Sequence, residues 1–401
     1  MAPRLYGKLA IEGGAPVRSS LLPYGRHHVT ANDIAAVAAV LRSDRLTTGP
    51  TGEQFEREFA SRVGNRFAVS FSSGTSALHG AAFAAGVGVD DEAIVTPLTF
   101  CATANAIVYQ RGCPVFADVD RNTLTLSPES VERAITPKTK AIFTVAFGGH
   151  PSACERLREI AHERGLLLIE DAAHALGAQV RGQPIGPRAD LTTFSFHPVK
   201  HIAGGEGGMV TTDCQELAER LRRFRNHGLT RDARERADAM QWQYDLVELG
   251  YNYRLSDLAA ALAFSQLDRL DANLERRREI VTRYREAFAH RPEFELPSEA
   301  PGYESAWHLY AVQVQPEFLT TDRDGIFEAL RAENIGVNVH YPLVPELTFY
   351  RENFGPFPRF PVAEDAAPRL LTLPLFPAMS EPDIDDVITA VHKVLDGYSR
   401  G

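Results

Sequence analysis

The chain has 401 residues, 44% of them hydrophobic and 23% charged, and its formal net charge at pH 7 is −10. This length and composition predict a soluble globular protein with room for one large domain and a smaller one. The acidic balance argues against general binding to nucleic acid, and no uncharged apolar run has the length of a membrane span. Because no basic segment followed by an apolar run stands at the start, we expect a cytoplasmic protein.

The first predicted elements alternate between strands and helices. Short apolar runs typical of strands occupy residues 67–71, 92–97, 114–120, 140–147 and 165–171. Helix-like segments lie between them at residues 76–86, 101–112, 127–135 and 153–165. This alternation predicts an α/β fold with parallel strands joined by crossover helices, and the lack of polar alternation predicts that both faces of the sheet are covered.

The second half of the chain predicts the end of this sheet and a smaller unit. Strand-like runs at residues 191–196 and 208–213 precede a helix-rich stretch over 214–288. Beyond a segment rich in proline and glycine, we expect strands at 308–314 and 337–341 and helices at 325–335 and 383–398. We therefore expect a large α/β domain at residues 1–290, including the N-terminal segment and the long helix, and a small α+β domain at residues 291–401.

Three stretches that follow predicted strands carry polar or reactive side chains, at the strand ends where ligands gather in open α/β sheets. The first, "FSSGTSALHG", opens a helix with hydroxyls and free backbone N–H groups around Gly74 and Thr75, as an anion site would. A serine or threonine helix cap explains the same residues equally well.

The other two stretches place a carboxylate and a lysine. "LLLIEDAAHA" ends a strand in Asp171, where a carboxylate needs a cationic or hydrogen-bonding partner, although a helix cap or an ion pair would also satisfy it. "FSFHPVK" places Lys200 after Phe194, Phe196 and Pro198. Burial of an unpaired ammonium is costly and lowers its pKa, so a lysine in this setting is suited to covalent chemistry.

Together these positions describe a site for pyridoxal phosphate. Its phosphate needs a helix N-terminus, its aldehyde needs a lysine, its ring nitrogen needs a carboxylate and its ring needs an aromatic lid. Phe100 in "TPLTFCATANA" is the candidate lid, although a phenylalanine there is more often simply part of the core. A metal site is not expected, because the four cysteines are scattered and Pro198 interrupts any helix between His197 and His201.

Eight ordered motifs carry a family resemblance over most of the chain. They are "LTTGPTGEQFEREFA", "SSGTSALHGA", "PLTFCATANAI", "IEDAAHALGA", "SFHPVKHIAGGEGGMV", "LGYNYRLSDLAAALAFSQL", "SAWHLYAV" and "NVHYPLVP". At these spacings the chain resembles the DegT/DnrJ/EryC1/StrS family of pyridoxal-phosphate-dependent sugar aminotransferases. The resemblance implies fold type I, with a mostly parallel central sheet, flanking helices and a smaller C-terminal α+β domain.

The resemblance also implies a role for each site residue. Lys200 would bond to the cofactor, Asp171 would pair with its ring nitrogen, and His174 would lie beside the ring or its O3′ oxygen. Ser195, Gly74 and Thr75 would hold the phosphate, and Phe100 would stack on the ring. The family's G-x-N-x-R pattern is present as Gly250, Asn252 and Arg254. In relatives this asparagine reaches the cofactor of the neighbouring subunit, so a homodimer with shared active sites is implied.

The same resemblance suggests the reaction. A lysine at position 200, where related dehydratases have histidine, favours transamination over dehydration. "SFHPVKHI" followed by "GEGG" is most similar to the branch that aminates C4 of nucleotide-linked 4-keto-6-deoxyhexoses, which includes the transaminase of pseudaminic acid biosynthesis, and L-glutamate is the usual amino donor. Thr48, His340 and Tyr341 are implied near the substrate, with His308 a weaker candidate, although each would serve equally well as a packed structural residue.

Other readings stay open at this point. A C3-specific sugar aminotransferase or a cyclitol aminotransferase would have the same cofactor residues, because position specificity depends on how the sugar is held. A non-catalytic relative that keeps the fold is disfavoured, since Lys200 and Asp171 are costly residues to keep facing one pocket. A nucleotide-dependent oxidoreductase is disfavoured because no glycine fingerprint follows the first strand.

Overall fold

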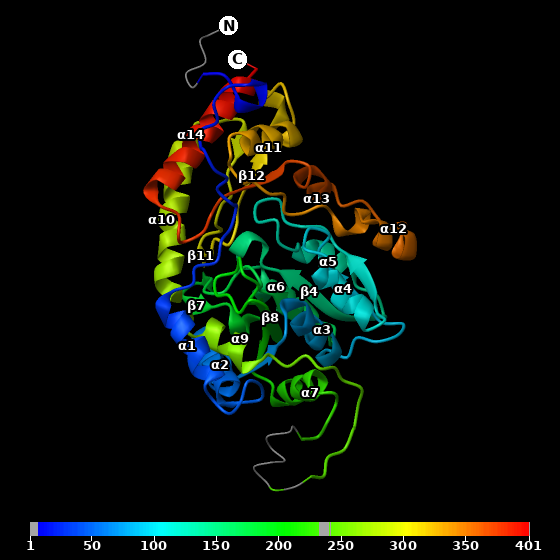
Figure 1. The fold of residues 1–401 in the computed structure, drawn as a ribbon. Helices are drawn as coiled ribbons and strands as arrows, with labels where there is room; N and C mark the ends of the chain where they lie inside the picture. Colours follow the sequence, from blue (N-terminus) through cyan, green and yellow to red (C-terminus); the bar gives the residue numbers. More distant parts are fainter. Residues whose placement is uncertain (1–6, 232–239, 241, 401) are drawn as a thin grey trace.

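The structure is a computed structural model and describes residues 7–231, 240 and 242–400 (Figure 1). The helices are α1 Ala31–Leu41, α2 Pro50–Val63, α3 Gly74–Ala84, α4 Ala102–Tyr109, α5 Pro128–Ala134, α6 Cys154–Glu163, α7 Gln215–Arg225, α9 Asp257–Phe264, α10 Leu270–Phe288, α11 Arg323–Ala332, α12 Thr348–Phe354, α13 Pro361–Ala366 and α14 Glu381–Tyr398. The strands are β1 Phe67–Phe71, β2 Glu92–Val95, β3 Cys113–Phe116, β4 Thr139–Val145, β5 Leu167–Asp171, β6 Gln179–Val180, β7 Gln183–Pro184, β8 Leu191–Ser195, β9 Gly208–Thr212, β10 Phe294–Glu295, β11 Tyr303–Glu304, β12 Tyr310–Val314 and β13 Leu370–Leu373.

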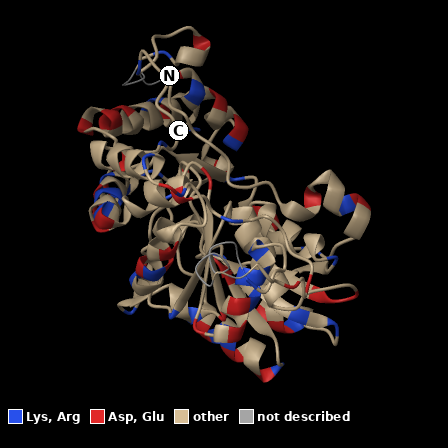
Figure 2. Ribbon diagram, turned by 60° about the horizontal axis from the view of Figure 1, so that its bottom comes forward, with Lys and Arg blue, Asp and Glu red and all other residues tan. Residues whose placement is uncertain are grey.

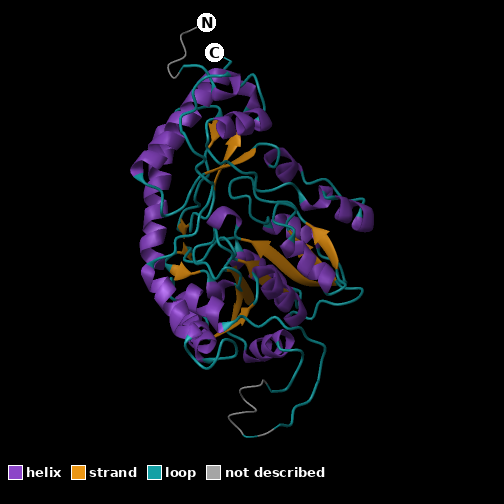
Figure 3. Cartoon of the chain, in the orientation of Figure 1, coloured by secondary structure: helices purple, strands orange, loops and turns teal. Residues whose placement is uncertain are grey.

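A seven-stranded sheet forms the centre of the molecule, in the order β1-β9-β8-β5-β4-β2-β3. All pairs between β8 and β3 are parallel, whereas β9 runs antiparallel to both β1 and β8. The expected α/β fold with a mostly parallel sheet is therefore confirmed. Figure 3 shows helices on both sides of this sheet.

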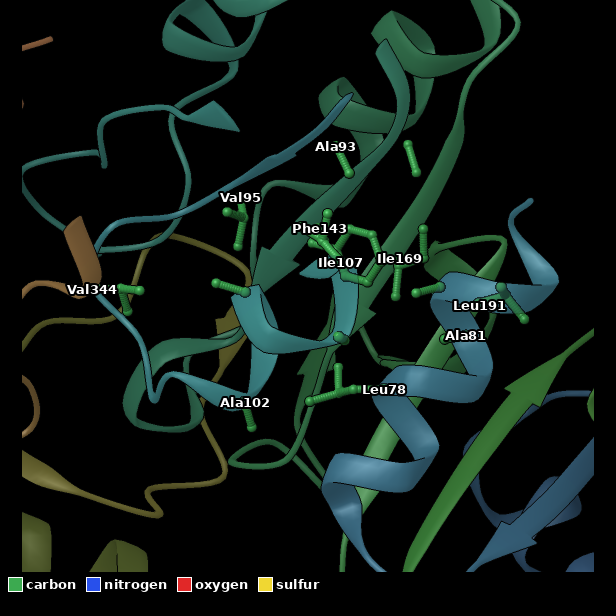
Figure 4. Close-up of a cluster of buried hydrophobic side chains, with 14 of the residues drawn as sticks. Leu78, Ala81, Ala93, Val95, Ala102, Ile107, Phe143, Ile169, Leu191 and Val344 are labelled. Atoms are coloured by element: carbon green, nitrogen blue, oxygen red, sulfur yellow. The ribbon is translucent and has the colours of Figure 1, made fainter. Parts of the chain in front are cut away.

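Both faces of the sheet are buried because successive residues of the apolar strands point to opposite sides. Ala93 and Val95 join Phe143 in one hydrophobic cluster with α3 and α4, and Figure 4 shows this side of the sheet. Ile94 and Ile142 instead join a cluster with α5 and α6. On that second side, α2 and α9 cover the strands β8 and β9. Covering both faces in this way fixes where each strand ends.

A second hydrophobic core lies at the end of the molecule where the two termini meet in Figure 1. It contains the sheet β10-β12-β13 together with α11, α14 and the second half of α10. Leu9 and Leu22 also belong to this core, so the N-terminal segment that we expected with the large domain packs on the C-terminal unit. The division of the chain at residue 290 stays a prediction.

Helix α10 connects the two cores. Leu270 and Leu274 in its first half pack with the large sheet, whereas Ile280 and Phe288 in its second half pack in the C-terminal core. The helix has 19 residues, and at about 1.5 Å per residue such a helix reaches across both units. The expected helix-rich stretch over 214–288 contains several helices, and α10 is the one among its described residues that packs in both cores.

One expected strand is absent. Residues 337–341 were predicted to form a strand, but they are joined to β13 only through the pairing of Asn338 with Thr372. Four consecutive residues of this segment, from Asn338 to Tyr341, line the same cavity. Strand side chains alternate between two faces, so a segment that lines one cavity with consecutive residues is not a regular strand.

The surface carries both signs of charge on many of its helices (Figure 2). Part of this charge is paired between α10 and α14, where Arg283 reaches Asp385 at 2.5 Å and Arg276 reaches Glu381 at 2.7 Å. All four cysteines are free thiols. Within the described ranges, no helix has both the length and the apolar character needed to cross a membrane.

Candidate active site

A cavity of about 670 Å³ lies at the carboxyl ends of the parallel strands. Its wall includes Asp171 at the end of β5, Ser195 at the end of β8 and the start of α3 after β1. The segment between β2 and α4 supplies Phe100. The turn after β8 supplies Lys200. The polar residues that the sequence placed after separate strands therefore converge on one cavity, as open α/β sheets allow.

Lys200 is partly buried in this wall. Burial lowers the pKa of its amine to about 8, and the charge of Asp171 opposes that change. Its Nζ lies 3.4 Å from Nε2 of His308. With this pKa about a tenth of the amine is neutral at pH 7, far more than for an ordinary lysine, and the neutral amine is the form that attacks carbonyl groups.

Asp171 is buried, with 6% of its surface exposed. Its Oδ1 accepts the backbone N–H of Ala173 at 3.1 Å, and its Oδ2 accepts the hydroxyl of Thr103 at 2.8 Å. Burial raises the pKa of this carboxyl, whereas the two hydrogen bonds and the positive charge of Lys200 lower it. Within the described residues Asp171 forms no ion pair, so it is not one half of a structural salt bridge.

The start of α3 forms a close contact with Ser195. Ser73 caps the helix by accepting the N–H of Ser76 at 3.1 Å, as the alternative prediction of a helix cap required. A Cβ added at Gly74 would stand 2.9 Å from both Cβ and Oγ of Ser195. The first N–H groups of a helix have no partner within the helix, so those of Gly74 and Thr75 remain available beside a serine hydroxyl. The helix cap and the anion site are thus compatible.

Four more side chains line the cavity around Lys200. Nε2 of His174 lies 3.2 Å from the hydroxyl of Tyr341, and the rings of His174 and His308 are 4.5 Å apart. His340 lies against Thr372, with Nδ1 and Oγ1 separated by 2.8 Å. Burial, followed by the charge of Lys200, lowers the pKa values of all three histidines, that of His340 to about 4. The cavity therefore surrounds Lys200 with neutral imidazoles.

Phe100 stands at the edge of the cavity rather than in the core, with 56% of its surface exposed. Its ring centre lies 6.1 Å from that of Tyr341. A large apolar side chain with this exposure has one face free for a ligand.

Two predicted residues lie outside this cavity. Asn252 is exposed and pairs through its backbone with Asn226. Thr48 lines a second cavity of about 540 Å³, together with Arg254 and Asp257. The structure of one chain therefore does not bring Thr48 and Asn252 to Lys200.

Several residues of the cavity were not singled out in the sequence. Thr103 binds Asp171, and Tyr24 comes from a distant part of the chain to stack near His340, at 5.4 Å between ring centres. Thr103 lies inside the motif "PLTFCATANAI", but its role depends on a contact between residues 68 positions apart. Nε2 of His201 lies 2.9 Å from the backbone oxygen of Ala306, and the expectation that His197 and His201 form no metal pair stays a prediction. In the described ranges, no cluster of three or more potential metal ligands was found.

The cavity fits pyridoxal phosphate. The close approach of Gly74 to Ser195 leaves space and donors for a phosphate, and Asp171 has acceptor capacity left for a protonated ring nitrogen. The Oγ1 of Thr193 and the Nδ1 of His174 are buried in the wall without hydrogen-bond partners among the described residues. Buried polar atoms are rarely left unpaired, so a polar ligand is expected here.

An open, mostly parallel sheet with a lysine, a carboxylate and a helix N-terminus at one cavity defines the class of type I pyridoxal-phosphate enzymes. Residues 27–392 match the model of the DegT/DnrJ/EryC1/StrS aminotransferase family, and the chain belongs to this family. It is therefore an aminotransferase that depends on pyridoxal phosphate.

Solved structures of sugar aminotransferases resemble the chain over almost its whole length. The putative sugar aminotransferase Spr1654 from Streptococcus pneumoniae, known in forms with pyridoxal and pyridoxamine phosphate, is 30% identical with a TM-score of 0.88, covering 94% of this chain and 99% of its own. Helicobacter pylori PseC, an aminotransferase involved in the biosynthesis of pseudoaminic acid, is 28% identical with a TM-score of 0.88, covering 94% and 100%. DesI, solved in the presence of its TDP-sugar product, is 33% identical with a TM-score of 0.87, covering 96% and 95%.

Proposed function

We propose that this enzyme transfers the amino group of L-glutamate to the C4 ketone of a nucleotide-linked 4-keto-6-deoxyhexose. The observation that carries the proposal is the convergence of Lys200, Asp171 and the start of α3 on one cavity. PseC and the TDP-sugar product of DesI support the substrate class. The similarity of "SFHPVKHI" and "GEGG" to the C4 branch supports the position on the sugar.

The bound cofactor supplies an aldehyde that takes up the amino group and a ring that withdraws electrons from the reacting carbon. In the proposed mechanism, Lys200 tethers the cofactor, and its released Nζ then moves a proton between the substrate carbon and C4′. A pKa near 8 suits both tasks, because the amine gains and loses a proton close to neutral pH.

Other residues hold the cofactor in the orientation that this proton transfer needs. Asp171 keeps a proton on the ring nitrogen, which stabilises negative charge as it develops. Gly74, Thr75 and Ser195 bind the phosphate, and Phe100 covers the ring. His174 lies beside Tyr341 in the same wall, in reach of the ring face or its oxygen substituent.

The substrate sugar is proposed to enter past His340 and Tyr341. Both line the cavity, and the hydroxyl of Tyr341 stays protonated because burial raises its pKa. A protonated hydroxyl donates hydrogen bonds to sugar oxygens. Nε2 of His308 lies 3.4 Å from Nζ of Lys200, which favours a role near the cofactor over one at the sugar.

We further propose that the active enzyme is a homodimer in which Asn252 completes the cavity of the partner subunit. The segment before Asn252 exposes large apolar side chains, namely Met240, Trp242, Tyr244, Leu246, Val247 and Leu249, with Leu249 exposed to 77%. So many large exposed apolar side chains within one short segment are typical of an interface. Asn252 and Thr48 lie away from the cavity of their own chain, as residues that serve a partner would.

Mixing two inactive variants tests this sharing. Lys200→Ala and Asn252→Ala are expected to be inactive or strongly impaired alone, and co-expression should restore about a quarter of the native activity, because half of the dimers are mixed and each mixed dimer has one intact site. Two differently tagged chains allow the mixed dimer to be isolated. Activity absent from the isolated mixed dimer would contradict the shared site.

Product analysis tests the substrate proposal. Purified enzyme with pyridoxal phosphate and L-glutamate is incubated with nucleotide-linked 4-keto and 3-keto 6-deoxyhexoses and with a keto cyclitol, and the position of the new amine is read by NMR. We expect amination at C4. Turnover confined to the 3-keto sugar or the cyclitol would instead support the two alternative activities of the same fold.

A further inference from the structure

A chain of two hydroxyls, from Thr99 and Thr103, leads to Asp171 in the wall of the cavity. Oγ1 of Thr103 lies 2.8 Å from Oδ2 of Asp171, and Oγ1 of Thr99 lies 3.0 Å from Oγ1 of Thr103. Both threonines are buried, with exposed fractions of 1% and 3%. They are four residues apart where the chain enters α4, so their side chains lie on the same side of this turn.

The chemistry of the groups sets the direction of these hydrogen bonds. An ionised carboxylate only accepts, so the hydroxyl of Thr103 donates to Asp171. The single hydroxyl hydrogen of Thr103 is then used, and Thr99 must donate to Thr103. The backbone oxygen of Phe100 is a competing acceptor for Thr103, but at 3.4 Å it is farther away and uncharged.

This direction matters because Asp171 is buried. Burial favours the neutral carboxyl, whereas a donor that binds the charged form favours ionisation. Two fixed donors, Thr103 at Oδ2 and the N–H of Ala173 at Oδ1, also hold the plane of the carboxylate. A carboxylate has about four acceptor positions, so capacity remains for a third donor from the cavity.

We propose that Thr103, supported by Thr99, is a positioning residue that keeps Asp171 ionised and oriented toward the ring nitrogen of the bound cofactor. The inference rests on the proposed role of Asp171. Thr103 acts through that carboxylate and does not touch the reacting atoms. This role depends on the hydroxyl of Thr103 and not on the volume of its side chain.

The test is the pH at which the visible absorption band of the bound cofactor changes, measured with the equilibrium dissociation constant for pyridoxal phosphate. A proton on the ring nitrogen would disfavour a second positive charge at Nζ of Lys200 once this atom is bonded to the cofactor, so it would keep this pH midpoint low. If the hydroxyl of Thr103 is lost, the ring proton is held less strongly. Thr103→Val should therefore raise the midpoint by about one pH unit and weaken cofactor binding by about tenfold, as loss of one hydrogen bond to a charged group would.

Matched variants separate the hydroxyl from packing. Thr103→Ser keeps the hydroxyl and should retain the native midpoint. Thr144→Val makes the same change on β4, at a buried hydroxyl that has no partner in the described part of the chain. This variant should also leave the pH midpoint unchanged. Thr99→Val should shift the midpoint in the same direction by a smaller amount, and it serves as the test if Thr103→Val does not fold.

The outcomes distinguish this inference from the proposed function. A raised midpoint in Thr103→Val, restored in Thr103→Ser, supports the inference. If Asp171→Asn raises the midpoint but neither Thr103→Val nor Thr99→Val does, the inference is wrong and the role of Asp171 stands. If Asp171→Asn itself leaves the midpoint unchanged, the role of Asp171 is wrong and the inference fails with it.

Discussion

The amine of Lys200 owes its predicted reactivity to its surroundings. Burial lowers its pKa to about 8, and the side chains of His174, His308 and His340 in the same cavity have lowered pKa values and are neutral near pH 7. As the pH rises through 8, the amine loses its proton and becomes a nucleophile. The rate at which the cofactor-free protein captures pyridoxal phosphate should therefore reach half of its limiting value near pH 8 and level off about one pH unit above that.

Stopped-flow absorbance across pH 6 to about 10.5 measures this rate, with Lys200→Ala as the control for lysines elsewhere. A lysine with the ordinary pKa near 10.4 would give a rate that keeps rising over the whole range. Such a profile would show that the cavity does not activate this amine.

Addition of one methyl group at Gly74 tests the proposed phosphate site. An alanine Cβ would stand 2.9 Å from the Cβ and Oγ of Ser195, so one of the two must move. We expect Gly74→Ala to weaken binding of pyridoxal phosphate by about tenfold or more, measured by equilibrium dialysis. Gly88→Ala is the control, because its nearest new contact is an oxygen of Asp91 at 3.7 Å. Equal affinities in the two variants would place the phosphate elsewhere.

The site residues that the sequence revealed are those whose charged side chains cost free energy in apolar surroundings. Lys200 after a run of apolar residues and Asp171 at the end of a buried strand both needed an explanation from nearby residues alone. Thr103, which donates to Asp171, lies 68 positions from it in the sequence, and His308, which lies beside Lys200, is 108 positions away. No local sequence pattern therefore predicts these contacts of Thr103 and His308.

At the scale of elements, the short helical turn η2 at Phe147–Gly149 links the two cores beside the cavity. The backbone oxygens of Gly148 and Gly149 accept the N–H groups of Leu309 and Ala306, each at 3.0 Å. These bonds fix the segment that carries His308 against β4. A turn of this kind requires glycine, since Gly149 has a φ of +108°.

Gly149→Ala should destabilise this junction. Its Cβ would stand 2.7 Å from the backbone N of Trp307 and 2.9 Å from that of His308, in addition to the strain of its φ. We expect a loss of about 2–5 kcal/mol in the free energy of unfolding, measured from urea denaturation. Gly182→Ala has a similar strain, with a φ of +75°, but no atom within 4 Å, and should lose about 1–2 kcal/mol. Equal losses would mean that the close contact with residues 307–308 carries no energy.

The parallel strands were predictable because buried strands read as continuous apolar runs, and β4 and β5 follow this pattern closely. The antiparallel direction of β9 could not be predicted from the sequence, because it depends on the short connection from β8 through the turn that carries Lys200. The segment 337–341 has the composition of a strand, yet its side chains turn into the cavity. Function overrides local preference at this point, since consecutive residues from Asn338 to Tyr341 contribute to the cavity wall.

At the scale of the whole molecule, buried charges join parts of the chain that are far apart in sequence. Arg277 in α10 donates to the backbone oxygens of Trp307 and Leu375, each at 3.0 Å. Burial lowers the pKa of this guanidinium to about 10, and it remains charged at neutral pH. These bonds attach α10 to the segment that carries His308, so the bridge between the two cores also supports the active site.

The N-terminal segment is attached in a similar way. The carboxylate of Glu333 accepts the N–H groups of Ala10 and Val17 at 2.8 and 2.9 Å, and Nζ of Lys393 lies 2.8 Å from it. Removal of one partner from a buried ion pair leaves a charge without compensation. Lys393→Met should therefore reduce the free energy of unfolding by about 3–5 kcal/mol, measured from urea denaturation.

The exposed pair between Arg156 and Glu132 supplies the comparison for Lys393. Its side chains are about half exposed, and Arg156→Ala should leave the urea midpoint of unfolding close to that of the native protein. If Lys393→Met were as mild as Arg156→Ala, the buried pair would not be what attaches the N-terminal segment.

The most direct test of the central claim is the visible absorption spectrum of the purified protein with pyridoxal phosphate, before and after addition of L-glutamate. We predict a band from the cofactor bonded to Lys200 that is absent in Lys200→Ala and that glutamate converts to the band of pyridoxamine phosphate. A spectrum that is the same in Lys200→Ala, or that shows only free cofactor, would contradict the assignment of Lys200 and with it the proposed mechanism.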